Sequence, residues 1–497
     1  MEVRVLSAAP TLFYQKGGHK LGEIVEPARG WRMSELEHVV QFRDEWGAVK
    51  PGFIQDVLAA LEQKDAKALR AQTRDLHAAD MADLLQAIEQ PHRVSLIAML
   101  GRSFDVEALA ELDEGARDAL MDALPADVIA SAIKKLDTDD ALYLIEDLER
   151  HEQVEILSKV SREDRVALSR ALDYAERTAG RLMQTEFVAV QEGWTVGQVV
   201  DHIRSEKDIP EVFVEIYVTN DTAHLKGAVP LSRLLRSARE KKIADIMDDE
   251  QTIFSVSDEQ DDVAYKFEQY NLVSAAVTDA SGRLVGMLMV DDILDVIQEE
   301  AEEAIRRMGG VGAEEAITGT VWATTQSRFW WLFVNLLTAV LASWVISWFD
   351  ATIQQMVAIA VLMPIVASMG GNAGTQTMTV AVRALATRQL GPANAFRVIF
   401  RECAVGLING LLFAVIVGLF VWWWFGFGSL GMVIGAAMII NLLAAALAGI
   451  LLPLALDYFE TDPAISAAVF LTTVTDVVGF FSFLGLATLL LRFGFLK

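Results

Sequence analysis

The sequence predicts a multidomain membrane protein with four parts: an all-α superhelical N-terminal domain, a tandem pair of α/β units, an acidic connecting helix and a five-helix transmembrane domain. Three observations predict this class. Runs of Leu, Ile, Val, Ala, Phe and Trp dominate from residue 320 onward. Residues 320–497 hold only seven of the 42 basic and six of the 68 acidic residues, so the preceding region has a net charge of −27. That region contains short amphipathic stretches, followed by a repeated pattern of strands and helices.

The acidic charge of the soluble region limits which kinds of partner it can bind. It argues against nucleic acid and anionic lipid as partners of this part, and it leaves cations, a basic protein or simple solubility. Cys403 is the only cysteine and lies in an apolar stretch, so no disulfide framework or thiolate metal site is expected. Because residues 1–20 lack the pattern of a signal peptide, we expect the soluble region to stay in the cytosol.

Residues 1–54 show little periodicity and are interpreted as an N-terminal extension. From 55 to 177 the chain consists of amphipathic stretches of about a dozen residues, many of which open with Asp or Pro. Such residues cap helices and complement the helix dipole. We therefore expect short helices stacked in a superhelix.

Two related units follow, at 178–244 and 245–296. Strand-like runs at 187–190 and 253–256 each precede a helix, two further strands and another helix, and residues 225–229 match residues 284–288 about 60 positions later. This tandem unit resembles a pair of CBS domains. Pro230, Met289 and Arg233 interrupt the Gly-x-x-Thr/Ser-x-x-Asp pattern that holds a nucleotide ribose in that family, so nucleotide binding is left open.

An acidic helix and linker at 297–319 lead into the transmembrane domain at 320–497. About 20 apolar residues cross a bilayer, and five segments qualify: 328–349, 352–380, 395–424, 429–456 and 463–491. Basic residues crowd the link between the second and third segments, at Arg383, Arg388, Arg397 and Arg401. The positive-inside rule then predicts a multi-pass protein of the cell (inner) membrane, with cytosolic N-terminal domains and the C-terminus outside.

Asp476 lies deep in the fifth segment, between apolar residues. A charge at the centre of a membrane helix costs about 2.5–3.5 kcal/mol and usually marks an ion path. Thr472 lies one turn before it. A protonated or hydrogen-bonded Asp without a transport role is the alternative.

The second segment contains the polar run 369–376, in which Asn372, Thr375 and Gln376 share a helix face. Their oxygens could receive a cation or its water shell, while Gly370 and Gly374 have the small-xxx-small spacing of helix packing. We find no P-loop, nucleophile elbow or HExxH motif in the sequence, so an ordinary soluble enzyme is not expected.

With these parts in order, the chain resembles the MgtE family of magnesium channels and transporters from about residue 55 to the end. The most specific matches are the runs 370–376 and 383–388 and the blocks at 462–464 and 476–479. The resemblance implies a homodimer whose ion path lies on the two-fold axis, with Asp476 of each subunit acting on hydrated Mg²⁺. Mg²⁺ prefers oxygen ligands and sheds water reluctantly, which suits such a pair of carboxylates.

The resemblance also implies that cytosolic Mg²⁺ closes the channel by bridging acids of several parts. The matching acids are Glu107, Asp139, Glu259, Asp261, Asp292, Asp295, Glu300, Glu303 and Asp462. Clustered carboxylates repel one another until a divalent ion binds, so closure would depend on Mg²⁺ concentration. Three alternatives stay open: a merely solvated acidic face, a transporter of another divalent cation such as Co²⁺ or Mn²⁺, and a membrane-anchored cation or nucleotide sensor that transports nothing.

Overall fold

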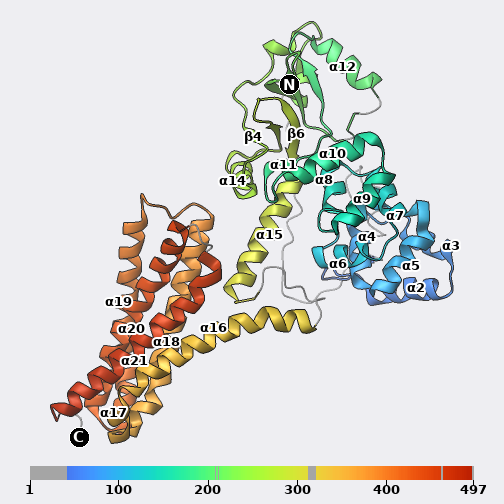
Figure 1. The fold of residues 1–497 in the computed structure, drawn as a ribbon. Coiled ribbons are helices and arrows are strands. Elements are labelled where there is room, and N and C mark those ends of the chain that lie inside the picture. Colours follow the sequence, from blue (N-terminus) through green and yellow to red (C-terminus); the bar gives the residue numbers. More distant parts are fainter. Residues whose placement is uncertain (1–41, 207–208, 211, 312–320, 460–462, 495–497) are drawn as a thin grey trace, which may run out of the picture. The chain divides into compact units, whose positions relative to one another are not determined.

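The structure is a computed structural model that describes residues 42–206, 209–210, 212–311, 321–459 and 463–494 (Figure 1). It divides into two compact units, residues 1–111 and 112–497, each described here by itself. The predicted fold class is confirmed: a helical N-terminal region, two α/β units, a long connecting helix and five membrane-length helices.

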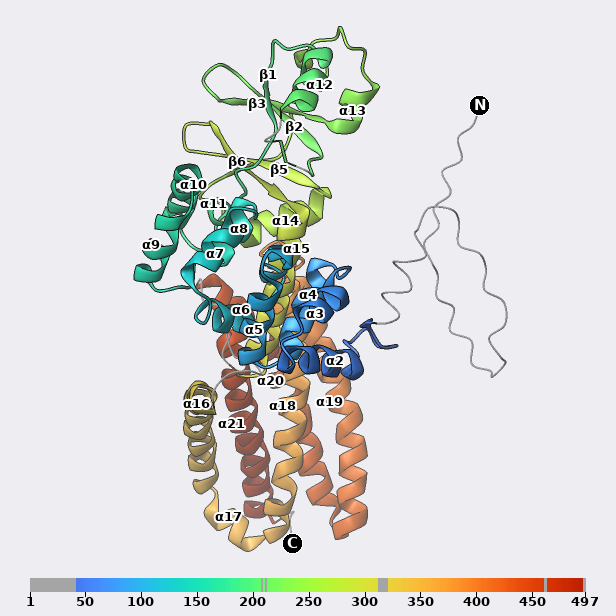
Figure 2. The same ribbon diagram turned by 90° about the vertical axis from the view of Figure 1, so that its right-hand side faces the viewer.

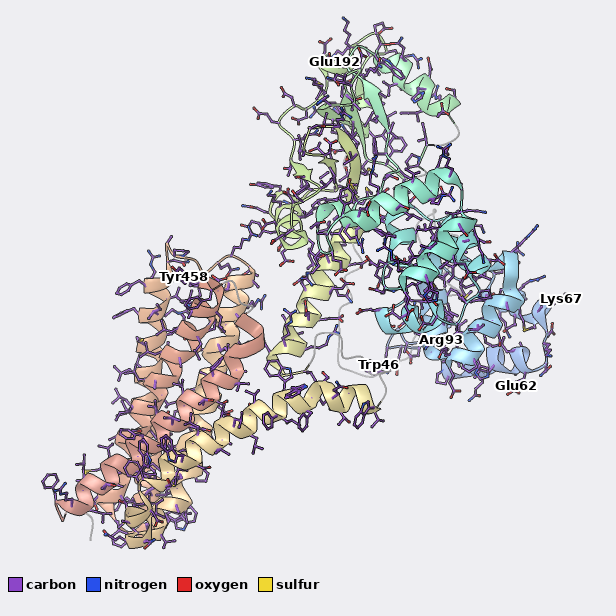
Figure 3. All side chains as sticks on the ribbon, in the orientation of Figure 1. Trp46, Glu62, Lys67, Arg93, Glu192 and Tyr458 are labelled. Atoms are coloured by element: carbon purple, nitrogen blue, oxygen red, sulfur yellow. The ribbon has the colours of Figure 1, made fainter. Side chains whose placement is uncertain are left out.

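The first unit consists of short helices around a Leu-rich core. They are α2 (Pro51–Glu62), α3 (Ala66–Thr73), α4 (Ala78–Ala87) and α5 (Gln90–Leu100), followed by the 3₁₀ turns η1 (Gly101–Ser103) and η2 (Val106–Leu109). The expected acidic cap occurs at Asp65, which accepts hydrogen bonds from the amides of Lys67 and Ala68. Arg93, labelled in Figure 3, is buried and donates from Nε to the carbonyl of Ile88 at 3.0 Å.

The second unit begins with six further helices of the same kind. These are α6 (Glu114–Met121), α7 (Ala126–Ile133), α8 (Thr138–Tyr143), α9 (Arg150–Lys159), α10 (Arg162–Asp173) and α11 (Ala179–Leu182). Asp113 caps α6 and Ser161 caps α10 through hydrogen bonds to backbone amides of the first turn. These caps satisfy donors that a helix start otherwise leaves unpaired, which is why such short segments hold their shape.

Two three-stranded sheets follow, and each repeats the other. The first contains β1 (Ala189–Gln191), β2 (Glu215–Thr219) and β3 (Leu225–Pro230), with α12 (Val196–Ser205), α13 (Leu231–Arg236) and the turn η3 (Ile243–Asp245). The second contains β4 (Ile253–Ser255), β5 (Ser274–Thr278) and β6 (Leu284–Met289), with α14 (Gln260–Tyr270). In both sheets the first pair of strands is parallel and the second antiparallel, with a register shift at the same place.

A shared apolar cluster joins the two sheets. Tyr217, Ala228, Ala276 and Met287 are buried together, so strands from both copies contribute to one core. Residues 225–229 and 284–288 were predicted to match, and each contains a glycine that the packing requires. A Cβ at Gly286 would lie 2.8 Å from the carbonyl oxygen of Gln184, and a Cβ at Gly227 would overlap the carbonyl oxygen of Asp248.

We expect Gly227→Ala to destabilise the soluble region by about 1–3 kcal/mol, because the methyl group would clash with the backbone carbonyl of Asp248, which cannot rotate away as a side chain could. The measurement is the melting temperature of the purified protein. Gly193→Ala is the matched control, since a Cβ there meets nothing within 4 Å. Equal melting temperatures for the two variants would contradict this account of the strand edge.

The chain then continues through α15 (Val290–Met308) into the membrane helices α16 (Val321–Ser347), α18 (Val357–Ala386), α19 (Ala395–Phe425), α20 (Gly428–Tyr458) and α21 (Pro463–Arg492). Within the described residues, five helices are long and apolar enough to cross a membrane. Glycines set the contact of α19 with α20: a Cβ at Gly406 would lie 2.7 Å from that of Ala446. The small-residue spacing on α19 therefore serves close helix packing.

One segment differs from its predicted bounds. The range 352–380 was predicted as one membrane segment, but the structure divides it between the short helix α17 (Asp350–Gln355) and α18. The break is at Met356, whose φ of −143° and ψ of 91° are extended. No Gly or Pro stands at this position, so the sequence carried no local signal for the break.

Candidate functional site

The two helices that carry the predicted pore residues, α18 and α21, lie side by side (Figure 2). Their close approach depends on small residues. A Cβ at Gly374 of α18 would lie 2.7 Å from Cδ1 of Leu471 on α21, and one at Gly449 of α20 would lie 2.8 Å from the carbonyl oxygen of Gly374. Packing of the glycine stripe thus fixes one face of α18 against its neighbours.

The opposite side of α18 presents its polar groups. Asn372, Thr375 and Gln376 are exposed on the surface of the single chain, whereas Gly370 and Gly374 are buried. The hydroxyl of Thr375 donates to the carbonyl of Gly371 at 2.9 Å, which leaves its lone pairs available. Amide and hydroxyl groups of this kind do not face hydrocarbon without a polar partner. This face therefore needs water, a hydrated ion or a second subunit against it.

Asp476 of α21 is half-buried, between the exposed Thr472 and the buried Gly479. Thr472 and Thr475 satisfy their hydroxyl donors on backbone carbonyls of their own helix, at 3.0 Å to Val469 and 3.0 Å to Thr472 respectively. Among the residues that the structure describes, the Asp476 carboxylate has no hydrogen bond or ion pair. A membrane carboxylate in this state is suited to bind a cation or its hydration water.

The acids of the connecting helix α15 fall into two groups, and the first is organised by an arginine. Arg177 forms an ion pair with Glu300 and lies 3.5 Å from Glu303 and 3.7 Å from Asp261. Glu303 also pairs with Arg307, one turn along its own helix. Three of the acids predicted to sense Mg²⁺ are therefore gathered, but around side-chain cations.

Arg177 was not singled out from the sequence. It lies 123 positions from Glu300 in the chain, and it has a positive φ of 59°. Its carbonyl accepts a hydrogen bond from the amide of Gln260 at 2.9 Å, and the Gln260 side chain donates to Glu300 at 3.1 Å. The turn before α11 and the start of α14 thus hold the guanidinium over α15.

The second group brings Asp139 at the start of α8 close to Asp292 at the start of α15. Burial, followed by the charge of Asp292, raises the pKa of Asp139 well above its usual value. Burial, followed by Asp291 and Asp140, raises the pKa of Asp292 to about 7. Within the described part of the chain, no Arg or Lys bonds to either carboxylate. This pair lacks the cation that the first group possesses.

Of the four remaining predicted sensor acids, Asp295 adds to the second group, because its charge raises the pKa of Asp292. Glu107 lies in the first unit, on η2, and is exposed. Glu259 is exposed at the N-cap of α14, Asp295 is exposed on α15, and Asp462 lies outside the described residues. Among described residues, no three His, Cys, Asp or Glu side chains are arranged to hold a metal ion.

We expect the contact between α8 and α15 to depend on pH in the absence of divalent ions. The folded-state pKa of Asp292 is raised to about 7, so its contribution to stability is greatest when it is protonated and falls as pH rises from about 4 to about 7. The charged groups that act on Asp292 are the acids Asp139, Asp140, Asp291 and Asp295, whereas the backbone amide of Met289 donates to its carboxylate at 3.3 Å and lowers its pKa.

In a chelating buffer, limited proteolysis of this region should therefore be faster at pH 8 than at pH 6. Mg²⁺ added at pH 8 should restore protection. Asp292→Asn keeps a neutral side chain at every pH, so this variant should be protected at pH 8 without Mg²⁺. Identical digestion of the parent at the two pH values would contradict the predicted repulsion.

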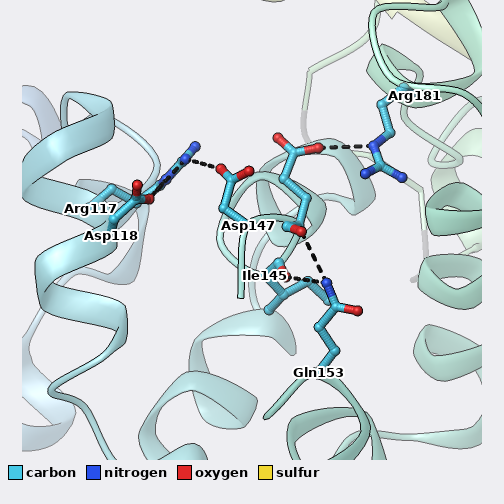
Figure 4. Close-up of polar contacts among 7 residues, drawn as sticks. Arg117, Asp118, Ile145, Asp147, Gln153 and Arg181 are labelled. Atoms are coloured by element: carbon cyan, nitrogen blue, oxygen red, sulfur yellow. Dashed lines mark hydrogen bonds and ion pairs between the residues drawn. The ribbon is translucent and has the colours of Figure 1, made fainter. Parts of the chain in front are cut away.

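A separate network stiffens the helices next to α15. Arg117 is almost fully buried and pairs with Asp118 and Asp147 (Figure 4). Its guanidinium also lies 3.9 Å from the centre of the Tyr143 ring. Next to Asp147 in the chain, Glu146 accepts a hydrogen bond from Nε of Arg181 at 2.9 Å. Tyr143 ends α8, so these contacts support the helix that presents Asp139.

The tandem sheets contain a cavity of about 400 Å³ at α13, lined by Pro230, Ser232, Arg233, Arg236 and Ser237. Arg233 donates to the carbonyl of Ile246 at 3.0 Å and approaches Asp248 at 3.8 Å. No carboxylate lines this cavity in the described residues, so it lacks the acid that would hold a ribose. Nucleotide binding gains no support from this geometry.

Three known families match the chain. Residues 363–486 match the divalent cation transporter family MgtE, residues 76–177 match the MgtE intracellular N domain, and residues 243–299 match the CBS domain. A magnesium transporter MgtE of Thermus thermophilus is 30% identical over 449 residues, covering 87% of this chain and 97% of that protein. One of Bacillus subtilis is 26% identical and covers 87% and 96%.

A solved structure of the cytosolic domain of the Mg²⁺ channel MgtE in complex with ATP is 27% identical, covers 49% of this chain and 99% of its own, and has a TM-score of 0.45. The family matches span both the soluble and the membrane parts, and the similarity to the Thermus protein runs along almost the whole of both chains. The chain therefore belongs to the MgtE family, whose members are membrane transporters and channels rather than enzymes.

Proposed function

We propose that this chain is a Mg²⁺-selective channel or transporter for magnesium uptake, and that it works as a homodimer. Its ion path is formed by α18 and α21 of both subunits around the two-fold axis. The N-terminal domains lie in the cytosol and the C-terminus lies outside, as the Arg-rich link between α18 and α19 indicates. Lipid covers the remaining apolar faces.

The observation that carries this proposal is Asp476 on α21, which has no partner among the described residues. It lies beside a helix whose Asn372, Thr375 and Gln376 are exposed on the single chain. A second subunit against this face would remove the polar groups from lipid and would bring two carboxylates to one axis. Two carboxylates repel each other in a membrane, and a divalent cation between them offsets that cost. The amide and hydroxyl oxygens suit hydrated Mg²⁺.

We further propose that cytosolic Mg²⁺ closes the path through the soluble acids. Asp139 and Asp292 fit such an ion best, because they are close, partly buried and without a basic partner among the described residues. Asp261, Glu300 and Glu303 fit less well, since Arg177 and Arg307 already neutralise much of their charge. Asp295 adds its charge to that of Asp292, and Glu107, Glu259 and Asp462 remain predicted contributors.

Flux into proteoliposomes tests the function. The purified protein should admit Mg²⁺, and Mg²⁺ should compete more effectively than Ca²⁺, Co²⁺ or Mn²⁺. Flux of Co²⁺ or Mn²⁺ in preference to Mg²⁺ would favour the alternative divalent substrate. No flux of any of these ions from a folded dimer would favour a membrane-anchored sensor.

A further inference from the structure

Asn441 is a single amide in the middle of α20, and the transport site described above does not use it. Its side chain is 0% exposed, at the point where α20 meets α18 and α21. Its neighbours on α20 are apolar: Ile440, Leu442 and Leu443 flank it directly. A buried amide in such surroundings costs stability unless its donor and acceptor are both satisfied.

Only the donor is satisfied within the described residues. Nδ2 of Asn441 donates to the carbonyl of Val366 on α18 at 2.8 Å, whereas Oδ1 has no partner there. A leucine, which has the same branched shape, would leave no acceptor unpaired. Stability alone would therefore not favour Asn at this position, and we expect Asn441 to have another role.

The space around Asn441 comes from two glycines, one on each helix of the ion path. A Cβ at Gly370 of α18 would overlap Nδ2 of Asn441, and a Cβ at Gly479 of α21 would lie 2.8 Å from the same atom. No larger residue fits at either place without displacing the amide. One side chain of α20 thus fixes where α18 and α21 cross it.

The ion-path residues follow directly from these crossing points. α18 begins at the end of the bundle where α21 finishes, so the two helices run in opposite directions (Figure 2). Asn372 lies two residues after Gly370, about 3 Å along its helix, and Asp476 lies three residues before Gly479, about 4.5 Å along its own. In antiparallel helices both displacements point toward the same end of the bundle, so the two polar side chains lie at similar depth.

We propose that Asn441 is a positioning residue of the ion path: its amide, wedged between Gly370 and Gly479, sets the register of α18 against α21 and thereby the relative depth of Asn372 and Asp476. A buried Asn fixes helix register at a cost in stability in coiled coils, which is the same physical device. The effect on transport rests on the proposed ion path, whereas the register of α18 against α21 can be measured without any transport.

The test replaces Asn441 by Leu, which keeps the branched shape of the side chain and removes both polar groups. Ala is the second variant, and it leaves the space beside the two glycines unfilled. Asn335→Leu on α16 is the matched control, because Asn335 is exposed and lies away from this crossing. Register is read from disulfide cross-linking of Gly374→Cys with Leu471→Cys, in a background where the native cysteine is removed by Cys403→Ser.

We expect Asn441→Leu to retain the melting temperature of the parent, to cross-link at least fivefold more slowly, and to lose at least tenfold in discrimination between Mg²⁺ and Ca²⁺. Asn441→Ala should share the last two changes, and Asn335→Leu none of them. Unchanged cross-linking with unchanged discrimination in both Asn441 variants would overturn the inference. If the parent itself carries no Mg²⁺, the proposed function fails, while the cross-linking rates still decide whether Asn441 sets the register.

Discussion

Asp476→Ala should abolish Mg²⁺ flux while leaving a folded, membrane-inserted protein. The carboxylate is half-buried in α21 and has no partner among the described residues, so nothing in the fold depends on its charge. Because both subunits carry the substitution, it removes both charges that would face a divalent ion on the axis, and with them the strongest attraction in the path. We expect at least a hundredfold lower initial rate of uptake in proteoliposomes, with an unchanged size-exclusion profile.

Asp476→Asn separates charge from hydrogen bonding, because it keeps the shape and an acceptor oxygen. It should lose most of the flux as well, if the ion is bound mainly by charge. Asp350→Asn is the matched control, since Asp350 lies in α17 and only accepts a hydrogen bond from Gln354 of the same helix. Normal uptake by well-expressed Asp476→Ala would remove Asp476 from the ion path.

Much of the fold could be predicted from local signals in the sequence. The membrane helices follow from uninterrupted apolar runs, the short helices of the N-terminal region from their capping residues, and the paired sheets from the match between residues 225–229 and 284–288. Each of these signals acts over a few residues or at a fixed repeat. The exposed polar face of α18 and the position of Asp476 on α21 were also readable from helical spacing.

The contacts that organise the candidate site were less accessible, because they join distant segments. Arg177 reaches Glu300 across 123 positions, and no pattern near Arg177 predicts that contact. Asn441 did offer a signal, a lone amide in the apolar segment 429–456, but only the structure shows that Gly370 and Gly479 face it. The family resemblance implied one set of sensor acids. The structure divides five of them into the group around Arg177 (Asp261, Glu300 and Glu303) and the pair without a described basic partner (Asp139 and Asp292).

Neutralising Glu300 and Glu303 together should have a large effect on the gate, because both acids belong to the group around Arg177. Arg177 at present joins these two glutamates of α15 to Asp261 of α14. Glu300→Gln with Glu303→Gln would leave its guanidinium with Asp261 alone and would release α15 from the α14 side. The closed arrangement should then be lost, and the double variant should conduct at millimolar Mg²⁺ levels that close the parent.

A change of two charges needs a control with the same change elsewhere. Glu302→Gln with Glu268→Gln serves as this control. In the described part of the chain, Glu302 bonds to Gln298 and Arg306 of its own helix and to no other side chain, and Glu268 is exposed on α14. This control should close at the Mg²⁺ concentration of the parent. In both variants Asp476 should still be required for flux, which separates the gate from the path.

Arg177→Gln should also weaken closure. Without the guanidinium, Asp261, Glu300 and Glu303 repel one another, so closure should need more Mg²⁺ and depend on it more steeply. Shifting a gate from 1:99 to 99:1 takes about 5.5 kcal/mol of differential binding, more than one weak site supplies, so several ions should act together. Protease protection and flux, each titrated with Mg²⁺, measure the change. If the Glu300 and Glu303 double variant and Arg177→Gln both close at the Mg²⁺ concentration of the parent, the acids of α15 around Arg177 form only a solvated face and have no part in the gate.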